Sequence, residues 1–93
     1  MAIFRYNELK AKGGFAVIIQ FFSRPNCELC SEGLQTLKIV QEDVPFTLEQ
    51  VNIEDHHELH EKYMLMIPVV EKNGAIIQYG RLDYVTLLEA LSE

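Results

Sequence analysis

The chain has 93 residues, of which 48% are hydrophobic and 24% charged, as expected for one globular domain. Its formal net charge of -6 argues against binding to nucleic acids or anionic membranes, because both require a basic face. Two cysteines are too few for a disulfide-stapled secreted miniprotein, and no apolar run is long enough to span a membrane. We therefore expect a cytoplasmic protein whose thiols normally rest reduced.

Residues 1–14 are interpreted as an N-terminal extension and residues 15–93 as the domain. Within the extension, a short helix from Asn7 to Lys12 and an edge strand at Ala2–Tyr6 fit the sequence equally well. The next segment, Phe15–Phe22, is nearly all apolar and rich in β-branched and aromatic residues. It predicts a central strand buried on both faces, which implies a sheet with helices on both sides.

The segment after Cys27 predicts a helix with one buried face, which Pro45 ends. Its apolar residues recur at spacings of three and four: Leu34, Leu37, Val40 and Val44. A second strand is expected at Phe46–Ile53, where apolar and polar residues alternate. Asp55 is the expected N-cap of a short polar helix over residues 56–63.

Ile67-Pro68 opens a third predicted strand, and Asn73-Gly74 is a strong signal for a two-residue hairpin turn. The returning strand is expected at Ala75–Tyr79, with Gly80 ending it. Asp83 can cap a final helix with one apolar face, formed by Tyr84, Leu87, Leu88 and Leu91.

The predicted order of elements is therefore β-α-β-α-β-β-α. A right-handed crossover between the first two strands places the first helix on one face of the sheet. We expect an α/β fold with a four-stranded mixed sheet and helices on both faces.

Cys27 and Cys30 are separated by two residues and lie between the first predicted strand and the first predicted helix. A cysteine at a helix N-terminus faces unpaired N–H groups and the positive end of the helix dipole, and both favour the thiolate. The thiolate is the attacking species in disulfide exchange, and a second cysteine nearby can resolve the mixed disulfide. The pair therefore predicts redox chemistry, with Cys27 as nucleophile and Cys30 as resolving thiol.

Three histidines, His56, His57 and His60, lie on the short polar helix and invite a zinc interpretation. The spacing from Cys30 to His56 is about twice that of a zinc finger. We therefore interpret the histidines as a solvated polar face and predict no metal site.

These features together resemble the thioredoxin fold, and more narrowly its glutaredoxin-like members. The resemblance covers about Phe15–Ser92. It rests on the apolar strand leading into Ser23-Arg24-Pro25-Asn26-Cys27-Glu28-Leu29-Cys30, on Ile67-Pro68, on Asn73-Gly74 and on Gly80 before the last helix. Thioredoxins carry a tryptophan before the first cysteine and a buried acid six positions before it. This chain has no tryptophan and has Phe21 at the second position, which favours the glutaredoxin-like group.

The resemblance implies that a cis peptide bond precedes Pro68, that Pro68 lies against the two cysteines, and that the backbone at Ile67 pairs with the substrate. Arg24 has two candidate roles, to lower the pKa of Cys27 or to meet a glutathione carboxylate. Glutaredoxins hold glutathione with Gly-Gly followed closely by Asp, and here Gly80 and Asp83 stand in the matching segment. The alternative is that Gly80 only ends a strand and Asp83 only caps a helix.

Glu28 and Leu29 replace the Pro-Tyr that typical glutaredoxins place between the cysteines. A carboxylate beside a thiolate disfavours its ionisation, so we expect Glu28 to make the pair more reducing. The alternative for Glu28 and for Arg24 is solvated surface charge.

The predicted function is that of a thiol–disulfide oxidoreductase that requires no cofactor. The expected partners are a disulfide-containing protein or a small-molecule disulfide, with glutathione or a thioredoxin reductase as candidate reductants. We expect a monomer. The alternatives are a module that handles a metal or an iron–sulfur cluster through Cys27, and a non-catalytic thioredoxin-fold interaction domain.

Overall fold

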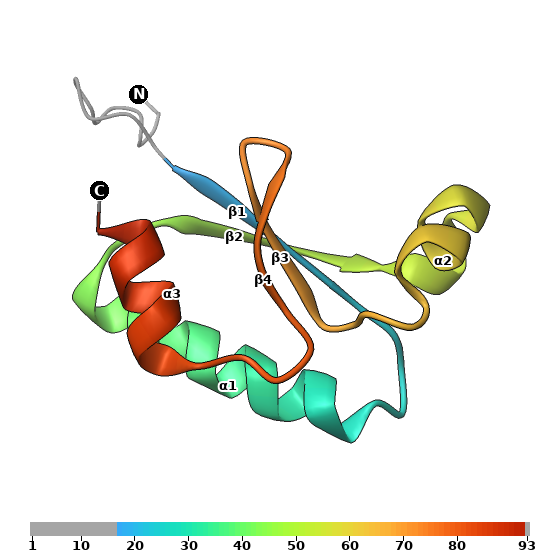
Figure 1. The fold of residues 1–93 in the computed structure, drawn as a ribbon, viewed down its shortest axis with the longest axis horizontal. Coiled ribbons are helices and arrows are strands. Elements are labelled where there is room, and N and C mark those ends of the chain that lie inside the picture. Colours follow the sequence, from blue (N-terminus) through green and yellow to red (C-terminus); the bar gives the residue numbers. More distant parts are fainter. Residues whose placement is uncertain (1–16, 93) are drawn as a thin grey trace, which may run out of the picture.

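The computed structural model describes residues 17–92, so the predicted extension over residues 1–14 lies outside the described residues. The elements follow the predicted order (Figure 1). They are β1 (Ile18–Ser23), α1 (Glu28–Asp43), β2 (Thr47–Asn52), the short 3-10 helix η1 (Ile53–Asp55), α2 (His57–Tyr63), β3 (Val69–Lys72), β4 (Ala75–Tyr79) and α3 (Tyr84–Leu91). No helix within residues 17–92 is both long and apolar enough to cross a membrane.

The four strands form one mixed sheet in the order β2-β1-β3-β4. β1 and β2 are parallel, whereas β3 is antiparallel to both β1 and β4. This pattern confirms the predicted α/β fold with a four-stranded mixed sheet. The carboxyl end of the central strand β1 leads directly into the loop before α1, where ligands commonly bind in sheets of this kind.

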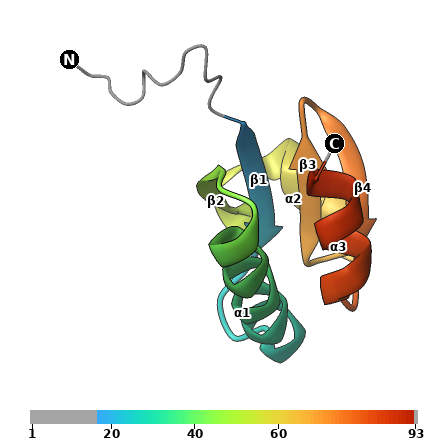
Figure 2. The same cartoon turned by 90° about the vertical axis from the view of Figure 1, so that its left-hand side faces the viewer.

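Alternate residues of the central strands point into two separate cores, as the pleat of a strand requires. Ile19, Phe21 and Val70 belong to the larger core, which α1 and α3 cover with Leu37, Val40, Leu87 and Leu91. Phe22 and Val69 face the smaller core, which Tyr63 of α2 and Ile53 complete. Figure 2 shows α1 and α3 lying side by side, in agreement with the contacts between these two helices.

The hairpin between β3 and β4 forms at the predicted dipeptide. Asn73 and Gly74 both have positive φ, 55° and 79°, which is the backbone that a tight turn between right-twisted strands needs. Asn and Gly adopt this region at low cost, which explains why this dipeptide lies there.

The predicted N-cap of α2 is wrong. Asp55 lies in η1, and His56 takes the N-cap position of α2 without a side-chain hydrogen bond. The physical reason lies upstream, since the Asn52 side chain accepts a hydrogen bond of 2.9 Å from the Glu54 N–H and starts a helical turn early. By contrast, Asp83 caps α3 as predicted.

Candidate active site

Cys27 and Cys30 are joined by a disulfide at the N-terminus of α1, with 5.2 Å between their Cα atoms. Cys27 is the N-cap residue of the helix, and its Sγ accepts a hydrogen bond of 3.2 Å from the Cys30 N–H. The local geometry is that of an Asp or Ser cap with sulfur in place of oxygen. In the reduced protein, the same N–H and the helix dipole favour a thiolate at this sulfur.

The two cysteines differ in exposure. Cys30 is only 4% exposed and packs into the larger core, whereas Cys27 is half-buried at the edge of that core. The loop that leads to Cys27 passes through Asn26 at a positive φ of 59°, a region that Asn tolerates better than most residues. Cys27 is therefore the more accessible of the two cysteines.

Pro68 lies on the other side of β1 from β2 and follows a cis peptide bond, as predicted. The proline is fully buried, and it packs against Gly33 of α1. A Cβ added at Gly33 would lie 3.1 Å from Pro68 Cγ and 2.9 Å from Leu82 Cδ1. Gly33 therefore allows α1 to approach Pro68 closely. The sequence analysis missed this role, although a glycine inside a predicted helix was the available signal.

The turn before Pro68 is held by backbone hydrogen bonds. The N–H groups of Met66 and Ile67 donate to the Tyr63 carbonyl at 2.8 and 3.0 Å. The N–H of Gly80 donates to the carbonyls of Met66 and Pro68 at 3.0 and 2.8 Å. Of the Ile67 backbone, which the resemblance pairs with the substrate, the N–H is already engaged within the chain.

Tyr63 and Glu71 form a buried polar pair that the sequence analysis also missed. The Tyr63 hydroxyl donates a hydrogen bond to the Glu71 carboxylate, and Tyr63 packs against Phe22 with 5.1 Å between ring centroids. Burial, reinforced by the hydrogen bond to the nearby Glu71 carboxylate, raises the pKa of Tyr63 to about 12. The available signal was an acidic residue directly after Val69-Val70 in an apolar strand.

Gly80 and Asp83 are occupied by contacts within the chain. Gly80 has a positive φ of 76°, and its N–H makes the two bonds described above. The Asp83 carboxylate accepts hydrogen bonds of 2.8 Å from both the N–H and the hydroxyl of Thr86, which lower the pKa of Asp83. The Asp83 N–H donates to Gln78 Oε1 at 2.9 Å. These contacts match the alternative of a strand end and a helix cap.

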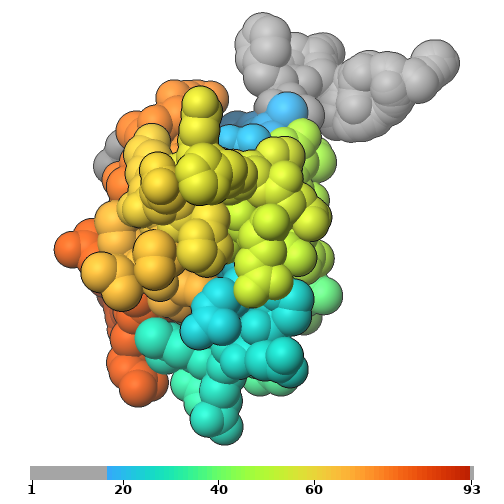
Figure 3. All heavy atoms as spheres, turned by 90° about the vertical axis from the view of Figure 1, so that its right-hand side faces the viewer, coloured from blue at the N-terminus to red at the C-terminus, as the bar shows by residue number. Residues whose placement is uncertain are grey.

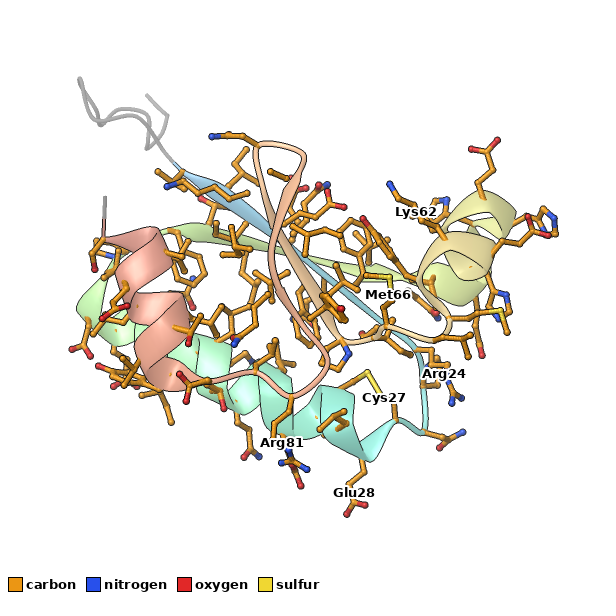
Figure 4. The ribbon with its side chains drawn as sticks, in the orientation of Figure 1. Arg24, Cys27, Glu28, Lys62, Met66 and Arg81 are labelled. Atoms are coloured by element: carbon orange, nitrogen blue, oxygen red, sulfur yellow. A yellow bond between two sulfur atoms is a disulfide. The ribbon has the colours of Figure 1, made fainter. Side chains whose placement is uncertain are left out.

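Several charged side chains lie in the region of the disulfide. Figure 4 shows Arg24 and Arg81 on opposite sides of Cys27, with the side chain of Glu28 directed away from the sulfurs. Arg81 forms an exposed ion pair of 3.6 Å with Glu32. Leu29, the other residue between the cysteines, is half-buried. Glu28 therefore acts on the sulfurs only through solvent, where its charge is screened.

His56 and His57 are exposed and His60 is half-buried, and His57 Nε2 lies 3.3 Å from the Glu61 carboxylate. Within the described part of the chain, no three histidine, cysteine or acidic side chains gather as a metal site would need.

Comparison with known proteins identifies the family of the chain. Residues 18–92 match the family model of the glutaredoxin-like domain (DUF836). A curated relative, the glutaredoxin-like protein YDR286C homolog of Dictyostelium discoideum, is 32% identical over 74 residues, which cover 73% of this chain and 68% of the relative.

Solved structures agree in fold. Protein Ne2328 from Nitrosomonas europaea aligns with a TM-score of 0.73 and 24% identity, covering 83% of this chain and 93% of that protein. Thioredoxin-2 of a malaria parasite aligns with a TM-score of 0.62 and 17% identity, covering 83% of this chain and 82% of that one. The chain thus has a thioredoxin fold and belongs to the glutaredoxin-like domain family.

Proposed function

We propose that this protein is a dithiol–disulfide oxidoreductase in which Cys27 attacks the substrate and Cys30 resolves the intermediate. The observation that carries the proposal is the position of Cys27, whose Sγ caps α1 and accepts the Cys30 N–H. An attacking sulfur must be both ionised and accessible, and Cys27 has the helix N-terminus for the first requirement and partial exposure for the second. Cys30, bonded to it and buried, suits the resolving role.

The reaction runs in two balanced steps. The Cys27 thiolate attacks one sulfur of a substrate disulfide, forming a mixed disulfide and releasing the first substrate thiolate, which takes up a proton. The Cys30 thiolate then attacks Cys27 Sγ, forming the 27–30 disulfide and releasing the second substrate thiolate. The substrate gains two electrons and the dithiol loses two, so no cofactor takes part. A thiol reductant must then regenerate the dithiol, which suits a reducing compartment such as the cytoplasm.

The test compares Cys27→Ser with Cys30→Ser. We expect Cys27→Ser to abolish reduction of bis(2-hydroxyethyl) disulfide, and Cys30→Ser to accumulate a mixed disulfide at Cys27 that mass spectrometry detects. Equal accumulation in both variants would refute the assigned roles. A parent protein that reduces no disulfide would instead favour a non-catalytic interaction domain.

A further inference from the structure

The turn between α2 and β3, Met64-Leu65-Met66, carries apolar side chains that the fold leaves in water. Leu65 is 91% exposed, the largest exposed fraction among the large hydrophobic side chains of residues 17–92. Met64 is also exposed, whereas Met66 is half-buried and packs against the smaller core. Since covering an exposed apolar side chain is favourable, this 64–66 turn is a candidate contact surface.

Tyr79 of β4 extends this surface. Its side chain is more than half exposed, and it lies directly opposite Val69 in the sheet, so the two side chains share one face. Val69 belongs to the smaller core, against which Met66 also packs. The Met66 carbonyl accepts the Gly80 N–H at 3.0 Å, which holds the end of β4 beside the turn. Met66 and Tyr79 are therefore neighbours on one face, next to Leu65, and form a patch with it.

The patch lies at the end of the sheet where the loop to Cys27 begins. Phe22 is opposite Val69 in the antiparallel pair of β1 and β3, so the chain leaves β1 and enters β3 at the same end of the sheet. Figure 3 shows the result at the surface, where the 64–66 turn, in gold, borders the loop of residues 23–27, in cyan. A polypeptide whose disulfide reacts at Cys27 is therefore within reach of the patch.

Two cations flank the patch. Lys62 precedes the turn by two residues, and Figure 4 shows Lys62 and Arg24 on either side of Met66. The nearest acidic residue of α2, Glu61, is directed towards His57, with 3.3 Å between its carboxylate and Nε2. A carboxylate carried beside an apolar side chain would therefore meet a cation at the edge of the patch.

These charges select among the possible occupants. A second copy docked patch to patch would bring Lys62 and Arg24 against the same two cations across a twofold axis, which is unfavourable. The formal net charge of -6 disfavours an anionic lipid surface. A polypeptide with a bulky apolar side chain next to a carboxylate meets both requirements, because it covers Leu65 and pairs with a cation.

We propose that the 64–66 turn and Tyr79 form a docking surface for a polypeptide disulfide substrate, which places an apolar side chain against Leu65 and an adjacent carboxylate beside Lys62. The proposal rests on the dithiol–disulfide exchange proposed above and adds the class of substrate. Docking adds no chemical step to that exchange.

The experiment measures the reduction of peptide disulfides by the fully reduced protein in single turnover. Each peptide has one cysteine, joined to 2-mercaptoethanol in a disulfide, and a test pair of residues placed at successive distances from the cysteine on either side. The pairs are phenylalanine–glutamate, alanine–glutamate and phenylalanine–lysine. Acid quenching and chromatography give a second-order rate constant, which is divided by that of the same peptide with dithiothreitol to remove differences in intrinsic reactivity.

At the distance that fits the patch, we expect the phenylalanine–glutamate peptide to react at least tenfold faster than the alanine–glutamate peptide, a ratio equivalent to about 1.4 kcal/mol. Leu65→Ser should bring this ratio to near one, and the fold should tolerate the change because Leu65 is almost fully exposed. Ile39→Ser is the matched control and should retain the parent ratio. Ile39 is 53% exposed on α1, about 18 Å along the helix from Cys27.

The charged residue of the pair tests the role of Lys62. The phenylalanine–glutamate peptide should react faster than the phenylalanine–lysine peptide, and Lys62→Gln should reduce that preference. Added salt should reduce it in the parent as well, because an exposed cation is screened. A faster reaction of the phenylalanine–lysine peptide would overturn the assignment of a carboxylate to the substrate.

Other results would overturn the docking surface while leaving the oxidoreductase intact. They are an apolar ratio near one at every distance in the parent, or a high ratio that survives in Leu65→Ser. A parent that sediments as a dimer and dissociates in Leu65→Ser would assign the patch to a second copy instead. Binding to phosphatidylcholine vesicles that Leu65→Ser abolishes would assign it to a membrane. If the parent reduces neither the peptides nor bis(2-hydroxyethyl) disulfide, the proposed function itself fails.

Discussion

The hydroxyl of Tyr63 donates a hydrogen bond to the carboxylate of Glu71 in the smaller core, where the two residues are 1% and 8% exposed. The carbonyl of the same tyrosine accepts the N–H groups of Met66 and Ile67. Tyr63 therefore connects a buried carboxylate of β3 to the turn that leads to Pro68. The pair is buried and structural in position, and it supports the backbone that leads to Pro68.

Tyr63→Phe should destabilise the protein by about 1–3 kcal/mol, because it leaves the buried Glu71 carboxylate without its phenol partner. Urea unfolding followed by far-UV circular dichroism measures the change. Tyr79→Phe is the matched control, because Tyr79 is 57% exposed and its loss should change the free energy of unfolding little. Replacing both partners, in Tyr63→Phe with Glu71→Leu, should recover part of the loss. Equal stability of Tyr63→Phe and the parent would show that Glu71 finds water instead.

The same pair predicts a stability loss at high pH. The pKa of Tyr63 is raised to about 12 in the folded protein, above its ordinary value of 10.0, so the folded state holds the phenol proton longer. This stabilisation is complete below pH 10 and is lost as the pH rises from 10 to 12, with an upper limit of about 3 kcal/mol. The free energy of unfolding should therefore fall more steeply with pH in the parent than in Tyr63→Phe. Parallel slopes for the two proteins would contradict the raised pKa.

The fold was predictable because its signals are local. The apolar run of β1, the Asn73-Gly74 turn and the cap at Asp83 each specify their own element, and the sequence order then leaves few arrangements of the sheet. The two cysteines were predictable for the same reason, since a strand, two spaced cysteines and a helix follow one another directly.

The features that the sequence could not predict depend on contacts between segments that lie far apart in the chain. Gly33 meets Pro68 only after α1 packs on the sheet, and Tyr63 meets Glu71 only after α2 covers the other face. The wrong cap at Asp55 has a local cause, because Asn52 competes as a cap three residues earlier. A cavity beside the disulfide is lined by residues of β1, the following loop and α1, so no single sequence motif predicts it.

Gly33→Ala should destabilise the protein although alanine favours helices by about 1 kcal/mol over glycine. The added Cβ would lie 3.1 Å from the ring of Pro68, which cannot rotate away, and 2.9 Å from the flexible end of Leu82. We expect the cost of overpacking to exceed the gain in helix propensity, with a net destabilisation of about 1 kcal/mol. A lower urea midpoint measures this loss. Adding Leu82→Val should relieve only part of the cost, because Pro68 remains. A midpoint above that of the parent would show that α1 shifts freely.

Glu28→Gln should raise the reduction potential of the pair by less than about 30 mV, the change that a tenfold shift in the equilibrium produces for this two-electron couple. The neutral side chain removes a negative charge from the first turn of α1, which makes the reduced pair easier to ionise. The effect is small because Glu28 points away from the sulfurs (Figure 4). Equilibration with glutathione buffers measures the potential, and Glu42→Gln at the far end of α1 is the control. The shift should shrink at high salt, and a larger or salt-independent shift would contradict action through solvent.

Gln78→Ala should increase the use of glutathione disulfide. In the parent, Gln78 Oε1 accepts the Asp83 N–H at 2.9 Å, so the start of α3 has one fewer donor for an incoming carboxylate. Removing the amide frees that N–H, and one charge-assisted hydrogen bond of about 1.4 kcal/mol would give about a tenfold gain. The measurement is the ratio of rate constants for glutathione disulfide and bis(2-hydroxyethyl) disulfide, because the second substrate has no carboxylate. Gln35→Ala, an exposed change on α1, should keep the parent ratio. An unchanged ratio in Gln78→Ala would mean that glutathione does not approach the start of α3 at all, and that the resemblance to glutaredoxins in Gly80 and Asp83 is confined to the backbone.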